Sequence, residues 1–200
     1  SQLSHDETIE NIEWFNISLE SKKLQRLAQA TLTFQVVKAS LDYSIEDFIK
    51  MAESVYISSD EVQAKLTEFN LHYGAHFQTI ESLYLGEGYV LAKLHTDLNC
   101  EEVLCHPTLL DGALQACSWL IAAPEGQMYL PIEFADITYY AAVGQDAFAL
   151  IRKGYSPDNQ STYFEIKLLD HNGHRLLDID KVRMSALESA NLKLLLHSED

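Results

Sequence analysis

The chain has 200 residues, of which 47% are hydrophobic, and a formal net charge of −16. This length suits one domain or two small halves that share a core. The acidic balance argues against binding to nucleic acid or to anionic membrane surfaces. The longest apolar run, residues 109–123, is interrupted by Asp111 and Gln115, so no membrane span is expected.

The three cysteines, Cys100, Cys105 and Cys117, form no CxxC pair. We therefore expect reduced thiols in a cytoplasmic protein. The acidic first residues, SQLSHDETIE, do not resemble a secretion signal. His95 and His106 could join two of the cysteines in a zinc cluster, but that spacing matches no familiar site, and no metal is predicted.

The first part of the chain predicts two strands and then two helices. Residues 10–19 and 30–37 are rich in β-branched and aromatic side chains, which favours strands. Helices are expected over residues 45–54 and 60–69 because each range is preceded by a capping box. The capping pairs are Ser44 with Asp47 and Ser58 with Glu61.

From Ile80 onward the pattern is mostly that of a sheet, interrupted by one long apolar helix around Asp111 with Pro107 in its first turn. The expected strands are residues 80–85, 89–95, 129–141, 147–153, 162–169 and 175–185. Gly86–Glu87–Gly88 predicts a hairpin turn between the first two. This order predicts an α+β fold in which an antiparallel sheet wraps around a central helix that is buried nearly all round.

The segment HPTLLDGALQ, residues 106–115, carries the main chemical signal. Asp111 and Gln115 are four residues apart, so a helix places both on one face. An acid among leucines is expensive to bury as an anion, and it can then hold a proton and act as a general acid. The alternative is an ordinary acid near a helix N-terminus, where the helix dipole favours negative charge.

Three motifs in order resemble the dehydratase domain of a modular (type I) polyketide synthase, mainly its second half. Residues 73–78, YGAHFQ, resemble the family's YGPxFQ segment, and residues 106–115 resemble its HPxLLDxxLQ helix. Leu130–Pro131–Ile132 resembles its LPF segment. The resemblance implies a hotdog fold, as a complete or partial double hotdog. Residues 1–69 would be a shortened or partial first half with a helical connection, residues 70–186 the second half, and residues 187–200 a linker.

The resemblance also implies roles for individual residues. Asp111 matches the catalytic acid that protonates the departing 3-hydroxyl of an acyl chain, and Gln115 matches the residue that orients this acid. The implied substrate-binding residues are Tyr73, Gly74, Phe77, Gln78, His106, Pro107, Leu130 and Pro131. For Phe77, Leu130 and Pro131, a plain role in the core or in a turn explains the residue at least as well.

Two departures from the family pattern matter. Ala75 stands where the family usually has proline, which should loosen the loop slightly. More seriously, no HxxxGxxxxP motif is present to supply the base that removes the C2 proton. Either the chain is a fragment, or a partner chain supplies the base, or the domain has a non-dehydrating role: structural, carrier-docking, chain-branching or cyclising.

The expected partners are an acyl carrier protein, which presents the substrate on phosphopantetheine, and neighbouring synthase domains. The resemblance also allows a homodimer. No directly bound cofactor is expected. Because carrier proteins are generally acidic, a basic patch should dock them. The candidates gather late in the chain: Arg152, Lys153, Arg175, Lys181 and Arg183.

Overall fold

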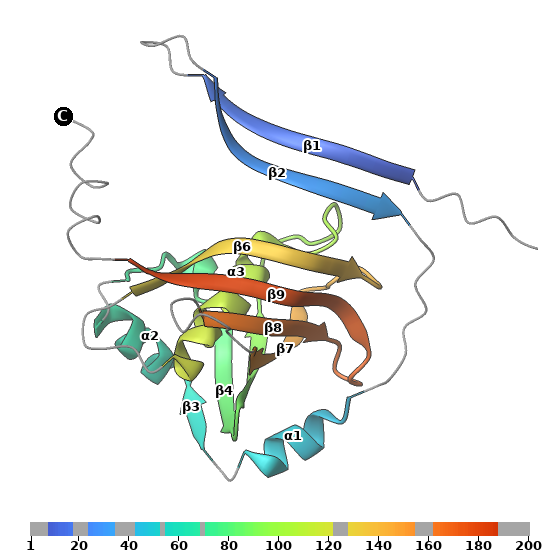
Figure 1. Cartoon of the computed structure of the whole chain (residues 1–200). Helices are drawn as coiled ribbons and strands as arrows, with labels where there is room; N and C mark the ends of the chain where they lie inside the picture. The colour runs from blue at the N-terminus through green and yellow to red at the C-terminus, as the bar shows by residue number, and fades with distance from the viewer. Residues whose placement is uncertain are drawn as a thin grey trace, which may run out of the picture. The chain divides into compact units, whose positions relative to one another are not determined.

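The computed structural model describes residues 8–17, 24–34, 43–52, 55–68, 71–121, 128–154 and 162–187. The chain divides into two compact units, Ser1–Lys38 and Ala39–Asp200, and each is described by itself (Figure 1). Across the described ranges, none of the helices has both the length and the apolar character needed to cross a membrane.

The first unit contains an antiparallel pair of strands, β1 (Thr8–Ile17) and β2 (Leu24–Phe34). A β-bulge shifts their register between Trp14 and Phe15. Both predicted strands are present, but β2 begins at Leu24 rather than at Ala30. The sequence hid this earlier start because Leu24 and Leu27 are three residues apart, a spacing more typical of a helix.

The second unit is built on a seven-stranded antiparallel sheet with the order β3–β4–β5–β7–β8–β9–β6. Its strands are β3 (Tyr56–Ser58), β4 (Ile80–Gly86), β5 (Tyr89–His95), β6 (Met128–Tyr139), β7 (Asp146–Lys153), β8 (Thr162–Leu169) and β9 (Arg175–Leu187). Its helices are α1 (Ile45–Met51), α2 (Ser59–Glu68) and α3 (Pro107–Ala116), with short 3₁₀ turns η1 (Ala75–Phe77) and η2 (Cys117–Leu120). The predicted α+β class with an antiparallel sheet is confirmed.

The main core lies between one face of the sheet and the helices α2 and α3. Leu109, Ala113 and Ala116 of α3 and Val62 and Leu66 of α2 are all fully buried in it. The strands contribute alternate residues to this core, as the period of two in a pleated strand requires. Because Val90 and Ala92 of β5 join the main core while Leu91 does not, the sheet has two distinct apolar faces.

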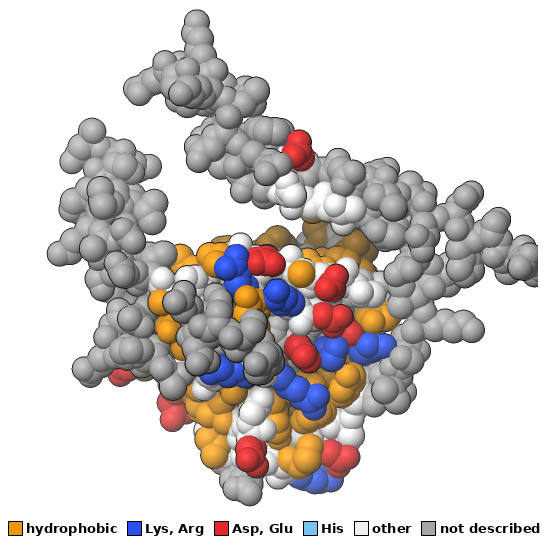
Figure 2. Space-filling model, in the orientation of Figure 1, with side chains coloured by type: hydrophobic (Ala, Val, Ile, Leu, Met, Phe, Trp, Pro, Cys, Tyr) orange, Lys and Arg blue, Asp and Glu red, His pale blue; other side chains and the backbone are white. Residues whose placement is uncertain are grey.

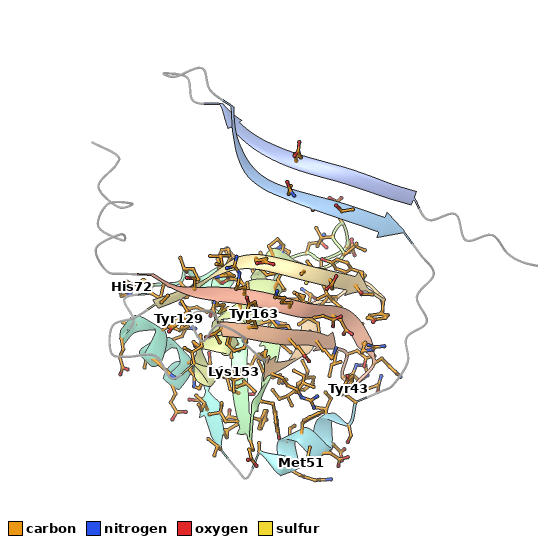
Figure 3. The ribbon with its side chains drawn as sticks, viewed as in Figure 1. Tyr43, Met51, His72, Tyr129, Lys153 and Tyr163 are labelled. Atoms are coloured by element: carbon orange, nitrogen blue, oxygen red, sulfur yellow. The ribbon has the colours of Figure 1, made fainter. Side chains whose placement is uncertain are left out.

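Helix α1 covers part of the opposite face. Its Phe48 ring packs edge-on against Tyr89 with ring centroids 5.2 Å apart, and the Tyr89 hydroxyl donates a 2.6 Å hydrogen bond to the Phe48 carbonyl. Tyr43, labelled in Figure 3 near the start of α1, donates its N–H to the Gly173 carbonyl at 2.9 Å. Gly173 has a φ of 84° and contacts the Tyr43 backbone so closely that a Cβ would not fit.

The predicted helix starts are confirmed by their caps. Ser44 Oγ accepts from Asp47 N at 3.2 Å. Ser58 and Glu61 form a reciprocal capping box, in which Ser58 N donates to Glu61 Oε2 at 2.8 Å and Glu61 N donates to Ser58 Oγ at 3.4 Å. These hydrogen bonds hold the pKa of Glu61 below its usual range.

Two features of the second unit differ from the sequence-based expectation. The short strand β3 was not predicted, because three residues are too few to show a period. Helix α3 is not buried nearly all round, since Leu110, Asp111 and Leu114 are only partly buried. The sheet covers the opposite side of α3, so within the described residues one stripe of this apolar helix is only partly covered.

Replacing Gly112 by alanine should destabilise the protein. A Cβ at Gly112 would collide with Thr79 Oγ1, which is itself bonded to the Thr108 carbonyl at 3.1 Å. We expect Gly112→Ala to lower the free energy of unfolding by about 1–3 kcal/mol, the typical cost of overpacking, in urea titrations. Gly144→Ala is the matched control, because nothing lies within 4 Å of its Cβ position. An equal loss in both variants would contradict the close contact between α3 and Thr79.

The stability should also depend on pH through His95. Its Nδ1 lies 2.8 Å from Asp146 Oδ1 and its Nε2 lies 3.1 Å from Asp97 Oδ1. The hydrogen bonds to Asp146 and Asp97 raise the pKa of His95. The stabilisation is therefore complete below the unfolded-state value, about 6.5, and is lost as pH rises through the folded-state value.

We expect the unfolding free energy of His95→Gln to fall less than that of the wild type as pH rises through this window. His171→Gln, in an exposed turn, is the control and should keep the wild-type pH dependence. If His95→Gln follows the wild-type curve at every pH, the two carboxylate contacts do not stabilise the folded state.

Candidate functional site

The candidate site is built around α3, from its N-cap to its last turn. His106 is the N-cap, and its Nδ1 accepts from Thr108 N at 3.3 Å, while Pro107 is the first helical residue. Proline suits this position because its missing N–H would have no partner in the helix. The structure therefore gives His106 and Pro107 a role in starting the helix, and their predicted contact with substrate stays a prediction.

Gln115 holds both Asp111 and the neighbouring loop. Its Nε2 donates to Asp111 Oδ2 at 2.8 Å and to the Phe77 carbonyl at 3.0 Å. These two bonds use both N–H groups of the amide, which fixes the orientation of a side chain that is only 5% exposed. Asp111 Oδ1 has no hydrogen-bond partner among the residues that the structure describes, and the carboxyl group is partly exposed. The predicted pair of Asp111 and Gln115 is thus brought together.

The loop of residues 73–78 lies against this pair. Gln78 Nε2 donates to the Tyr73 carbonyl at 2.9 Å, and Phe77 N donates to the Gly74 carbonyl at 2.9 Å. Burial, and to a lesser degree the nearby Asp111 carboxyl, raises the pKa of Tyr73. Phe77 reaches Gln115 through its backbone, while its side chain is 41% exposed.

Leu130 and Pro131 lie on β6, the edge strand of the sheet. Leu130 is 38% exposed, and Pro131 pairs with Met184 of β9 next to a register shift. Neither is joined to Asp111 by a hydrogen bond within the described ranges. The structure therefore does not distinguish their predicted substrate role from a structural one.

The sequence reasoning missed Thr79, which brings α3 close to the sheet. Thr79 is buried and bonds the Thr108 carbonyl, next to the position where only a glycine fits at residue 112. The signal was available, because a glycine inside an otherwise apolar helix often marks a close approach. A contact between residues so far apart in the sequence is invisible to local patterns.

The cysteines and histidines do not form a metal centre in the described part of the chain, where no group of three or more such ligands is found. Cys100, Cys105 and Cys117 are free thiols. Burial, and then the neighbouring Cys100, raises the pKa of Cys105 to about 11, and burial also raises that of Cys117. Such thiols are poor nucleophiles near neutral pH.

Several of the late basic residues are paired or packed within the chain itself, and Figure 2 shows acidic and basic side chains next to one another on the face in view. Arg175 Nη1 pairs with the buried Asp178 at 2.7 Å, and Arg183 Nε pairs with Glu133 at 2.7 Å. Arg152 lies over the ring of Phe48 on the α1 side of the sheet. Two of the five predicted docking residues therefore pair with carboxylates of the chain itself.

A family model described as "Polyketide synthase dehydratase N-terminal domain" matches residues 51–193. The chain is 24% identical over 155 residues to polyketide synthase PksN and 27% identical over 146 residues to polyketide synthase PksM, both from Bacillus subtilis strain 168. These matches cover 74% and 66% of this chain, but only 3% of each synthase. The sequence motifs resembled the second half of the dehydratase domain, whereas this description names an N-terminal domain. The assignment of the chain to the second half therefore stays a prediction.

Two solved structures share the fold. The dehydratase domain from the CurF module of curacin polyketide synthase has a TM-score of 0.77 and 23% identity, over 90% of this chain and 64% of that one. A trans-AT polyketide synthase dehydratase domain from Brevibacillus brevis has a TM-score of 0.77 and 21% identity, over 90% and 66%. The chain thus spans less than two thirds of either domain, and the predicted hotdog fold is confirmed. Because the family model matches more than two thirds of the chain, this protein belongs to the polyketide synthase dehydratase family.

Proposed function

We propose that the chain carries the acid half of a dehydratase site that acts on 3-hydroxyacyl thioesters. The observation that supports this most strongly is the Asp111–Gln115 pair. The Gln115 amide fixes one carboxyl oxygen of Asp111, and the other oxygen has no partner among the described residues, on the partly exposed stripe of α3. A positioned carboxyl group with one unoccupied oxygen is suited to deliver a proton.

In this reaction a base takes the proton from C2, and the C2–H electron pair becomes the C2=C3 double bond. The C3–O bond breaks at the same time, and its electron pair leaves with the oxygen. Asp111 protonates that oxygen, so the departing group is water rather than hydroxide. Gln115 acts as a positioning residue because it contacts the acid and not the reacting atoms.

The base is the missing part. None of the 200 residues forms an HxxxGxxxxP motif, and losing a placed general base typically costs about 10²–10⁴-fold in rate. Two solved structures of CurK dehydratase are of inactive variants, in which a histidine is replaced by phenylalanine or an aspartate by asparagine. By analogy, full dehydration requires a base that none of the recognised motifs of this chain supplies.

The missing base also supports a second candidate function. Without a base the site would bind an acyl chain but not dehydrate it, and the domain would serve a structural, carrier-docking, chain-branching or cyclising step. Under either function we expect an acyl carrier protein to present the chain on phosphopantetheine, beside neighbouring synthase domains. Of the predicted docking residues, Arg152, Lys153 and Lys181 are not in ion pairs with described carboxylates. A cytoplasmic location remains an expectation from the sequence.

The two functions differ in the effect of Asp111→Asn, which keeps the size of the side chain but cannot donate an acidic proton. With a 3-hydroxyacyl thioester on a carrier protein and imidazole added as an external base, we expect wild-type product lighter by one water and a loss of at least about 10²-fold in Asp111→Asn, measured by mass spectrometry. Asp136→Asn is the control, because Asp136 is exposed and has a φ of 55°, which asparagine tolerates. Equal turnover in wild type and Asp111→Asn would exclude the acid role, and absence of turnover in both would favour the non-dehydrating function.

Gln115→Leu tests the positioning role independently of turnover. The substitution keeps the volume but removes the hydrogen bond to the Phe77 carbonyl, and such a bond contributes about 0.5–1.5 kcal/mol. We expect a loss of unfolding free energy in this range, together with faster proteolysis within residues 71–79. Gln145→Leu is the control, since Gln145 is exposed and makes one 3.3 Å bond to the Leu98 carbonyl. A Gln115→Leu protein as stable and as resistant as the control would show that this amide does not hold the loop.

A further inference from the structure

Lys65 of α2 lies over the indole of Trp119, with its Nζ 4.3 Å from the ring centroid. Burial lowers the pKa of Lys65, although the charge of Glu68 opposes this. A cation over an indole face gains roughly 0.5–2 kcal/mol. That contact stabilises the ammonium group but does not neutralise its charge.

Lys65, like Lys153 and Lys181, has no carboxylate partner among the described residues, unlike three other lysines of this acidic chain. Lys50 pairs with Glu46 at 3.6 Å, Lys93 with Glu81 at 2.8 Å and Lys167 with Asp178 at 3.2 Å. Within the described residues, no carboxylate oxygen lies within 4.0 Å of the Lys65 ammonium group. The ammonium group is partly removed from water and is influenced by Glu68 only from beyond ion-pair distance, so a bound anion would supply a direct ionic contact that it lacks.

The position of this lysine connects it to the candidate site. Asp111 and Gln115 lie one turn apart on α3, and Trp119 follows on the 3₁₀ turn η2 directly beyond the end of that helix. Residues 59–78 meet this part of the chain at three points: Tyr73 lies near Asp111, Phe77 contacts Gln115, and Lys65 contacts Trp119. At a rise of 1.5 Å per residue in α3 and about 2.0 Å in the 3₁₀ turn, Trp119 is roughly 13 Å along the axis from the acid.

We propose that Lys65 and Trp119 form an anion subsite of the Asp111 site, which takes a phosphate or carboxylate group of the bound thioester. This inference rests on the proposed binding of acyl thioesters. The anion has two sources in such a molecule: the phosphate of the phosphopantetheine arm, or a carboxylate at the end of the acyl chain. Trp119 packs against the lysine on one side, and the anion pairs with the ammonium group on another.

The test measures binding of thioesters that cannot lose water because they lack a 3-hydroxyl group. Butanoyl-pantetheine carries no charge, butanoyl-phosphopantetheine adds the phosphate, and succinyl-pantetheine adds a terminal carboxylate. Dissociation constants are measured by calorimetry with the whole chain. We expect at least one charged probe to bind roughly tenfold tighter than the neutral one, as a charge-assisted contact of about 1.4 kcal/mol implies.

Variants assign the preference to the lysine. Lys65→Met keeps the long apolar stem over Trp119 and should abolish the preference, whereas Lys65→Arg should keep it. Lys50→Met, on exposed α1, is the control and should bind like wild type. Unfolding curves establish that each variant is folded. The Lys65→Arg protein keeps the positive charge, so its affinity shows whether the charge or the lysine side chain itself is needed.

Each outcome decides the proposal. A preference for the phosphate probe that Lys65→Met removes assigns the subsite to the pantetheine arm, and the same result with succinyl-pantetheine assigns it to the acyl tail. Equal binding of all probes, or a preference that survives Lys65→Met, overturns the subsite. Because no probe can dehydrate, failure of the dehydratase function does not affect the measurement, whereas absence of binding by every probe contradicts the subsite and thioester binding together.

Discussion

The hydrogen bonds of the Gln115 amide are the interaction on which the site depends. One N–H group holds the Asp111 carboxyl at 2.8 Å, and the other holds the Phe77 carbonyl at 3.0 Å. A single buried side chain therefore ties the acid to the loop of residues 73–78, which belongs to a different part of the chain. Since both N–H groups are used, the amide cannot rotate without losing one bond. A change in the position of the loop would therefore also change the orientation of the Asp111 carboxyl group.

The packing around α3 explains why this acid is accessible although its helix is apolar. Thr79 and Gly112 let α3 approach the sheet closely, which buries Leu109 and Ala113. The opposite stripe, which includes Leu110 and Leu114, is only partly covered. Asp111 lies at the border of these two environments, where a carboxyl group can be positioned by the protein and still meet a ligand. This arrangement fits the acid role better than an isolated cap at a helix start.

Basic residues of the second unit are held in two ways. Arg183 on β9 pairs with Glu133 on β6, which joins two strands, whereas Arg175 and its partner Asp178 both lie on β9. On the α3 side, Lys65 is held by an indole ring rather than by a carboxylate. A negative chain repels an acidic carrier protein at long range. The proposed anion subsite at Lys65 would act only at short range, where a direct contact between the ammonium group and the anion outweighs this repulsion.

The local pattern of the sequence determined most of the elements of this protein. The caps at Ser44 and Ser58, the hairpin before Tyr89 and the Asp111–Gln115 spacing are local properties, and the structure contains each of them. The motifs determined the family, because three separate segments had to match in order. Neither the local pattern nor the motifs determined whether the motif residues bind substrate. For one of them, His106, the structure shows a role as helix N-cap.

Only the tertiary structure decided how these elements meet. The sheet order with β6 at the edge, the contact of Thr79 with Gly112 and the stacking of Lys65 on Trp119 all join residues distant in the sequence. So does the bond from Gln115 to Phe77, which the spacing of Asp111 and Gln115 could not reveal. Hydrophobic periodicity states which face of an element is buried, but not which element buries it. Partners are chosen by packing and by hydrogen bonds across the whole chain, and these exist only in the folded state.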